Sequence, residues 1–188
     1  AHSLSSIFDV AWSPDGTLLA ICGSSSPYVV AYQWTEGVGF GTKYANPASI
    51  STVTSSQLNG VAFNPAGTVI AVSGNATSSQ YGLNAWPWNN STGFGTRYTA
   101  PSTTQGVWLN GGVTWSPSGG AVAAAGAIQA VYSWSDSSGF GTRYTNPASV
   151  PVGGGRSVTW STTGAALFLG NDASPYLYAY AWSDSTGF

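Results

Sequence analysis

The segment WSDSSGFGTRYTNP, residues 134–147, decides the fold because variants of it recur along the chain. Each copy has a tryptophan, four polar or small residues and then Gly-Phe. The copies begin at Trp34, Trp88, Trp134 and Trp182, which lie 54, 46 and 48 residues apart and which we call the anchor tryptophans. A second aromatic position recurs at Trp12, Phe63, Trp115 and Trp160, at intervals of 51, 52 and 45 residues. A regular period defines a repeat architecture, and the unit here is about 47 residues long.

Within each unit apolar and polar residues alternate with a period of two, which predicts short strands and tight turns rather than helices. In the first unit FDVAWS, TLLAICG and YVVAYQW are the first three strands, and Pro14-Asp-Gly is the turn between the first two. The fourth strand is expected after each GFG. It is placed at Gly41–Pro47, Gly95–Pro101 and Gly141–Pro147, each ending on a proline that suits a strand end or a sheet edge.

Four short strands per unit predict the blade of a β-propeller. We therefore predict an all-β chain with a single propeller domain, 1–188, whose four blades are residues 1–47, 48–101, 102–147 and 148–188. The segment YLYAYAW, residues 176–182, supports this prediction, because large side chains alternate with leucine and alanine. Large residues on one face and small ones on the other are what two sheets stacked face to face require.

The segments VAWSPDGTLLA, VAFNPAGTVIA and VTWSPSGGAVA resemble the inner two strands of WD40-like propeller repeats. The anchor tryptophan stands where that family has Trp-Asp, although the next residue here is Thr35, Asn89, Ser135 or Ser183 and the Gly-His pair is absent. The segments SSPYVVAYQW and GFGTKYANPAS are similar to WD40-like repeats of marine tailed bacteriophages and environmental viral genomes. This resemblance covers essentially the whole chain and implies a place on the outside of a bacteriophage particle.

A fourth strand follows only the first three copies, so we expect the last blade to lack its outer strand. Three arrangements are compatible with this: a small closed ring of four blades, half of an eight-bladed ring made by two chains, or part of a longer propeller. The third strand of the last blade is then a sheet edge, which is prone to pair with other chains. The predicted assembly edge consists of Tyr176, Tyr178, Tyr180 and Trp182.

Charge is scarce, with four Lys and Arg against six Asp and Glu in 188 residues. The chain has no basic field to attract phosphates, so nucleic acid and anionic membranes are disfavoured as partners. No apolar run reaches the ~18 residues of a membrane span, and we expect no membrane insertion. The single cysteine, Cys22, excludes an internal disulfide, and its apolar neighbours predict a buried thiol. A surface of hydroxyls and amides with little lysine suggests an extracellular or virion-surface location.

Side chains suited to catalysis are equally scarce. The only histidine is His2, so the sequence predicts neither a nucleophile with its base nor a histidine-based metal site. Glu36, Asp136 and Asp184 fall in the same turn of different blades, too far apart for paired carboxylates. We expect no enzymatic activity, no catalytic residues, no cofactor and no metal.

Departures from the repeat concentrate in two sets of loops, those from fourth to first strand and those from second to third. In a propeller both sets emerge on one face, which we call the loop face and which is the default binding surface. The predicted ligand-binding residues are Trp108, Gln105, Asn110, Asn75, Gln80, Asn171 and Asp172. The leading hypothesis is a non-enzymatic structural or recognition module that engages protein chains, either copies of itself or virion proteins. Because an aromatic ring among amides suits a sugar, the alternative is a carbohydrate-binding lectin.

Overall fold

A computed structural model describes residues 4–48, 50, 57–76, 81–104, 107–150 and 153–188. Within these residues the strands form four antiparallel sheets, three with four strands and one with three. The helical structure described there is a single 3₁₀ turn, Ser102–Thr104, so this part of the chain has no helix that could cross a membrane. The sheets confirm the prediction of four blades, the last with three strands.

The strands of each blade follow one another in chain order across the sheet. Blade 1 contains β1 (Ser6–Trp12), β2 (Leu18–Ser24), β3 (Val29–Thr35) and β4 (Gly39–Lys43). Blade 2 contains β5 (Leu58–Phe63), β6 (Val69–Gly74), β7 (Leu83–Asn89) and β8 (Gly93–Phe94). Blade 3 contains β9 (Val113–Trp115), β10 (Ala121–Ala124), β11 (Ala130–Ser135) and β12 (Gly139–Arg143). Blade 4 contains β13 (Gly155–Trp160), β14 (Ala166–Asn171) and β15 (Leu177–Ala181).

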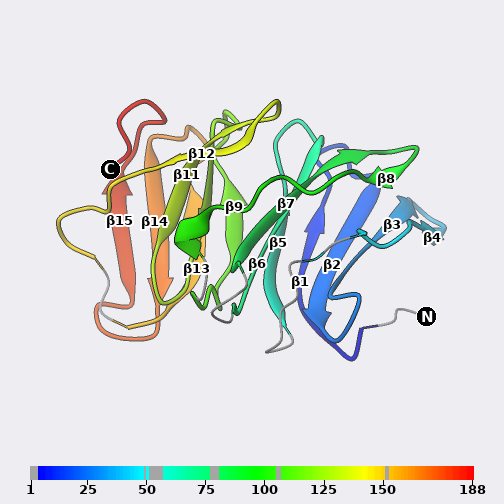
Figure 1. Cartoon of the computed structure of the whole chain (residues 1–188), viewed down its shortest axis with the longest axis horizontal. Helices are drawn as coiled ribbons and strands as arrows, with labels where there is room; N and C mark the ends of the chain where they lie inside the picture. Colours follow the sequence, from blue (N-terminus) through cyan, green and yellow to red (C-terminus); the bar gives the residue numbers. More distant parts are fainter. Residues whose placement is uncertain (1–3, 49, 51–56, 77–80, 105–106, 151–152) are drawn as a thin grey trace.

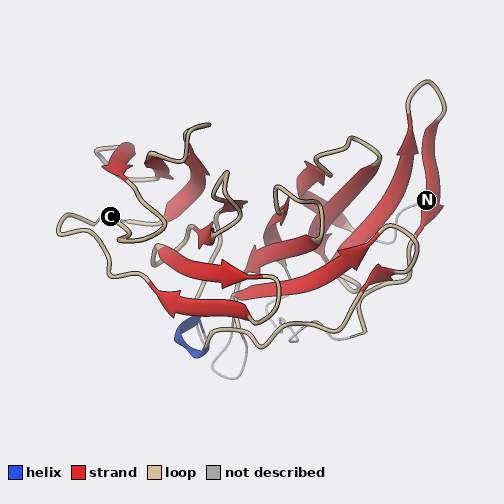
Figure 2. Cartoon of the chain, turned by 90° about the horizontal axis from the view of Figure 1, so that it is seen from above, coloured by secondary structure: helices blue, strands red, loops and turns tan. Residues whose placement is uncertain are grey.

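The blades form an open, curved row with blade 1 and blade 4 at opposite ends (Figures 1 and 2). The first strands β1, β5, β9 and β13 lie next to one another in that order and form the inner edge of the row. A small closed ring of four blades, one of the arrangements compatible with the sequence, is therefore not formed. In both views blade 1 and blade 4 remain apart at the two ends of the row (Figures 1 and 2).

Each pair of neighbouring blades shares a core between two unlike faces. In blade 2 the face toward blade 1 carries the large side chains, which include Phe63, Trp86 and Trp88. We call this the aromatic face of a blade. The opposite face, which we call the small-residue face, carries residues such as Ala71 and Ala85 and packs on blade 3. The sequence alternation of large and small side chains thus gives each sheet one large and one small face, as predicted.

Cys22 lies on the small-residue face of blade 1 and is fully buried. Burial raises the pKa of its thiol well above the ordinary value, so the reactive thiolate is suppressed at neutral pH. The expectation of a buried thiol is confirmed.

The fourth strands begin earlier than the sequence predicted. β4 and β12 start at Gly39 and Gly139 and end at Lys43 and Arg143, so the predicted segments reaching Pro47 and Pro147 are only partly strand. In blade 2 the predicted strand Gly95–Pro101 is absent, and β8 comprises only Gly93–Phe94. The tyrosine after Lys or Arg is the last residue bonded to the third strand: Tyr44, Tyr98 and Tyr144 donate their backbone N–H groups to Ala31, Ala85 and Val131, while their side chains contact the next blade.

Candidate functional site

A tyrosine from each of the first three blades packs on the anchor tryptophan of the following blade. The ring centroids of Tyr44 and Trp88 lie 4.8 Å apart, with an angle of 72° between the ring planes. The Tyr98–Trp134 and Tyr144–Trp182 pairs repeat this edge-to-face geometry at 4.9 Å and 4.8 Å. Such pairs contribute about 0.5–1.5 kcal/mol beyond the area that they bury. We call this contact the tyrosine clasp.

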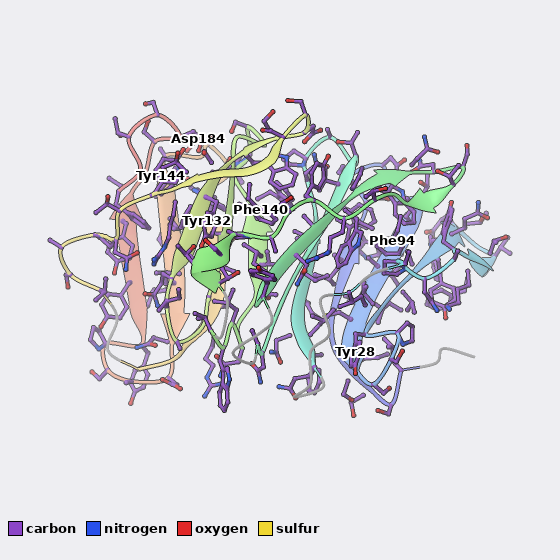
Figure 3. All side chains as sticks on the ribbon, in the orientation of Figure 1. Tyr28, Phe94, Tyr132, Phe140, Tyr144 and Asp184 are labelled. Carbon is purple, nitrogen blue, oxygen red and sulfur yellow. The ribbon has the colours of Figure 1, made fainter. Side chains whose placement is uncertain are left out.

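The hydroxyl group of each clasp tyrosine donates to a backbone carbonyl in the turn after the anchor tryptophan. Tyr44 Oη donates to the Asn90 carbonyl and Tyr98 Oη to the Asp136 carbonyl, both at 2.7 Å. Tyr144 donates to the Asp184 carbonyl in the same way, and the two residues lie side by side in Figure 3. Each clasp therefore joins two blades by both packing and a hydrogen bond.

Asp136 and Asp184, which lie in the turns after Trp134 and Trp182, add a second link between neighbouring blades. Asp136 accepts a hydrogen bond from Trp134 Nε1 at 2.7 Å and another from Thr68 Oγ1 of blade 2 at 2.8 Å. Asp184 likewise accepts from Trp182 Nε1 at 2.7 Å and from Ser118 of blade 3. These carboxylates are occupied in joining blades.

Blade 1 has the same aromatic face without a clasp. Trp34 contacts only rings of its own blade within the described structure: Trp12 at 5.4 Å and Phe40 at 5.3 Å. Trp12 is 51 % exposed, whereas its equivalents in the other blades, Phe63, Trp115 and Trp160, are 8 %, 6 % and 7 % exposed. A position that is buried in three blades is open to solvent in the first.

The open face of blade 1 is largely apolar. Val10, Trp12 and Phe40 are all more than half exposed, and Phe8 is nearly so. Its end nearest the loops is covered, because Leu4 packs there on Ile21 and the strand beside it. Exposed apolar surface of this extent commonly marks an interaction site. The sequence did not predict this site, because Trp12 matches Phe63, Trp115 and Trp160, which are all buried.

Blade 4 presents the complementary surface at the other end. Of the predicted assembly edge, Tyr176 is 68 % exposed, while Trp182 is 6 % exposed beneath Tyr144. Tyr178 and Tyr180 are half-buried, and Tyr180 Oη donates to the Ser149 carbonyl at 2.8 Å. Solvent instead meets the small-residue face of the edge strand β15, whose outward residues are Leu177, Ala179 and Ala181.

The loop face brings together two of the predicted ligand-binding residues. Asn75 and Trp108 form an isolated antiparallel bridge, and the Trp108 carbonyl accepts from Ala127 N at 2.9 Å. The Trp108 side chain is 56 % exposed, and Asn110 is half-buried. Backbone pairing between blades therefore fixes the main chain here and leaves the indole in solvent.

Gln80 and Gln105 lie outside the described residues.

The predicted pair Asn171 and Asp172 serves the local structure of blade 4. Asp172 accepts from Gly154 N at 2.7 Å and forms an ion pair with Arg156 at 2.7 Å. The hydrogen bond from Gly154 N–H, with the Arg156 charge, lowers the pKa of the Asp172 carboxyl below its usual range. Asn171 is buried and donates to the Ala173 carbonyl at 3.3 Å. The contacts of Asp172 tie the loop after β14 to the start of β13.

A hollow of about 420 Å³ lies on the outer rim between blades 2 and 3. Thr103, Tyr132, Phe140 and Arg143 are among the residues that line it; Tyr132 and Phe140 lie together in Figure 3. The Arg143 guanidinium donates to the Gln129 carbonyl and to Asn146 Oδ1, both at 3.2 Å. The Arg143 side chain therefore stabilises loops of its own blade.

Each of the six carboxylate side chains accepts a hydrogen bond from at least one other residue of the chain. The six and their donors are Asp9 with Val61, Asp15 with Ser13 and Thr17, Glu36 with Trp34, Asp136 with Trp134 and Thr68, Asp172 with Gly154 and Arg156, and Asp184 with Trp182, Ser116 and Ser118. In the described part of the chain no three His, Cys, Asp or Glu side chains gather as metal ligands. His2 lies outside that part.

Comparison with known proteins identifies the fold and goes no further. No protein-family model and no curated protein sequence matches the chain. A chain of the mitotic checkpoint complex matches with a TM-score of 0.66 and 19 % identity over 96 % of this chain and 52 % of its own length. A protein named as a 6-phosphogluconolactonase of Bacteroides uniformis matches with a TM-score of 0.71 and 15 % identity over 97 % and 52 %.

Kuenenia stuttgartiensis hydrazine synthase matches with a TM-score of 0.62 and 17 % identity, over 96 % of this chain and 47 % of the synthase chain. The chain thus spans about half the length of the solved structures that it matches. These structures support a propeller-like fold, and unrelated functions share that fold.

Proposed function

We propose that this chain is a non-enzymatic structural and recognition module that binds other protein chains through the open ends of its row of blades. The observation that carries the proposal is the exposure of Trp12, 51 % against 6–8 % at the three equivalent positions. Aromatic side chains dominate the energetics of protein interfaces, and tryptophan is enriched at their centres. The checkpoint-complex chain, which belongs to a protein assembly, has the same fold and supports the proposal.

The carboxylates support the non-enzymatic part of the proposal. General acids and bases need groups whose protonation is matched to a reaction, usually in a cleft. Here all six carboxylates accept hydrogen bonds that stabilise turns or join blades, and the cysteine thiol is buried.

The location that we propose is the outside of a bacteriophage particle. The resemblance of the repeats to those of tailed bacteriophages supports this location, together with a surface poor in charge. An extracellular particle protein of this kind would meet its protein partners at the ends of the row and leave the loop face free.

Photo-crosslinking in the native assembly tests the proposal. A photoreactive phenylalanine analogue is placed at position 12, with a matched control at Thr142, which is exposed on β12 away from both ends. We expect crosslinks to a protein chain from position 12 and none from position 142. If position 12 reacts only with solvent, the protein-binding proposal is wrong.

The second candidate function, a lectin, is favoured by one observation. Trp108 is 56 % exposed beside the backbone bridge to Asn75, where an indole can stack on a sugar ring. A glycan array decides this question. Binding to a defined glycan class that Trp108→Ala abolishes and Tyr176→Ala preserves would support the lectin, and no binding to any glycan would exclude it.

A further inference from the structure

The three interfaces inside the chain are copies of one interface. In each, the small-residue face of one blade packs on the aromatic face of the next. At the contact between blades 3 and 4, for example, Ala121, Ala123 and Val131 meet Trp160 and Trp182. Repeat proteins extend by stacking such units, because one unit cannot bury its apolar faces alone.

The two ends of the row are the unmatched halves of this interface. On blade 1, Val10 and Trp12 stand where blade 3 has Val113 and Trp115, which are buried against blade 2. On blade 4 the outward Ala179 stands where blade 3 has Val131, which is 2 % exposed against blade 4. Both end faces are apolar, so no like charges would face each other when the two faces come together.

We propose that a second copy of this chain covers the open face of blade 1 with the small-residue face of its blade 4. The inference rests on the proposed protein-binding function and names the partner. The contact is head to tail, so repeating it closes a ring of eight blades from two copies if the curvature of the row continues. The solved chains of the same fold are about twice as long as this one, which is the length that two copies supply.

The geometry also sets the expected strength of the contact. Within the chain each interface has strand-face packing together with a tyrosine clasp, and the three clasp tyrosines, Tyr44, Tyr98 and Tyr144, are all engaged. The contact between copies thus contains the packing without a clasp among the residues described. We expect it to form reversibly and to dissociate on dilution, with a dissociation constant on the order of micromolar.

Sedimentation of the purified 188-residue chain from about 1 μM to about 100 μM, a range that brackets micromolar affinity, tests the proposal. We expect the mass to rise from one copy to two. Val10→Glu at one end and Ala179→Glu at the other should each weaken association at least tenfold, because each buries a charge at the contact. Thr142→Glu is the matched control and should associate like the original chain.

Mixing the two end variants gives the sharpest test. Val10→Glu keeps an intact blade 4 face and Ala179→Glu keeps an intact blade 1 face, so an equimolar mixture should recover a dimer with one interface. Both positions are exposed in the single chain, so unchanged thermal unfolding of each diluted variant shows that folding is intact.

Three results would overturn the proposal: an original chain that stays single across the range, a mixture that does not recover, or sensitivity to Val10→Glu alone. The last would mean that two blade 1 faces pair with each other. An intact mass showing that further blades of the same polypeptide cover the face would overturn it as well. A crosslink from position 12 to a different protein, with no self-association, would leave the proposed function standing without this partner.

Discussion

Trp134 and Trp34 occupy the same position in two blades, and their surroundings differ by one neighbour. Trp134 is packed between Trp115, Phe140 and the clasp ring Tyr98, and its indole donates to Asp136 at 2.7 Å. Trp34 has the first two kinds of contact and no clasp. The aromatic face of a blade is thus covered by the blade before it, and that of blade 1 has no such cover among the described residues.

The largest expected effect comes from removing the two tryptophans in turn. Trp134→Ala should lower the free energy of unfolding by about 3–5 kcal/mol, the usual loss for a large buried aromatic. Trp34→Ala should cost less than half of that, because its partly exposed ring has fewer neighbours to lose. Urea unfolding of both variants measures the difference, and equal losses would mean that the clasp adds nothing to blade 3.

A pair of glycines isolates the clasp more cleanly. Gly39 and Gly139 have φ values of +101° and +81°, so an added Cβ strains both backbones. At Gly139 that Cβ would also lie 2.8 Å from the Tyr98 ring, whereas at Gly39 nothing lies within 4 Å. Gly139→Ala should therefore lose about 1–3 kcal/mol more than Gly39→Ala, the usual cost of overpacking. Equal thermal destabilisation of the two variants would argue against a tightly packed clasp.

The hydroxyl of the clasp should have a smaller effect. Tyr98→Phe removes the donor to the Asp136 carbonyl and should lower the free energy of unfolding by about 0.5–1.5 kcal/mol. The matched control is Tyr176→Phe, at a hydroxyl on the open end of the row, and it should leave stability unchanged. A Tyr98→Phe variant as stable as the original would show that water replaces the bond without loss.

The same tyrosines predict a dependence on alkaline pH. Burial raises the pKa of Tyr98 and of Tyr144 above the ordinary value near 10, and the neighbouring Asp136 and Asp184 charges act in the same direction. The folded state therefore holds these protons more tightly than the unfolded state. Their contribution to stability is complete below about pH 10 and is lost as the pH rises through the folded values. Thermal unfolding midpoints should fall there, and less steeply in the Tyr98→Phe, Tyr144→Phe double variant.

Much of the fold was predictable because its causes are local. The spacing of Trp34, Trp88, Trp134 and Trp182 predicted the blades, and the alternation around Tyr178 and Ala179 predicted which sides of a sheet are large and small. The early start of β4 and β12 was missed because Gly39 and Gly139 close the turn with positive φ, which allows Phe40 and Phe140 to pair with the anchor tryptophans.

The candidate site was less predictable because it depends on which face lacks a neighbour. The pattern around Trp12 matches that around Trp115, so the sequence contains nothing to show that Trp12 is exposed. Trp182 was placed on an open edge, although Tyr144 of blade 3 covers it. Trp108 and Asn75 were correctly grouped by their position in the repeat, since loops after equivalent strands emerge together. Asp172, in the loop after β14, pairs with Arg156 of β13, a contact that the repeat does not encode.

The central claim is that the aromatic face of blade 1 is a binding surface and is covered in the working assembly. The most direct test is a structure of the native assembly in which the exposure of Trp12 can be read. We expect Trp12 to be buried there to the level of Phe63, Trp115 and Trp160, at less than a tenth exposed. An assembly in which Trp12 remains half exposed to solvent would contradict it.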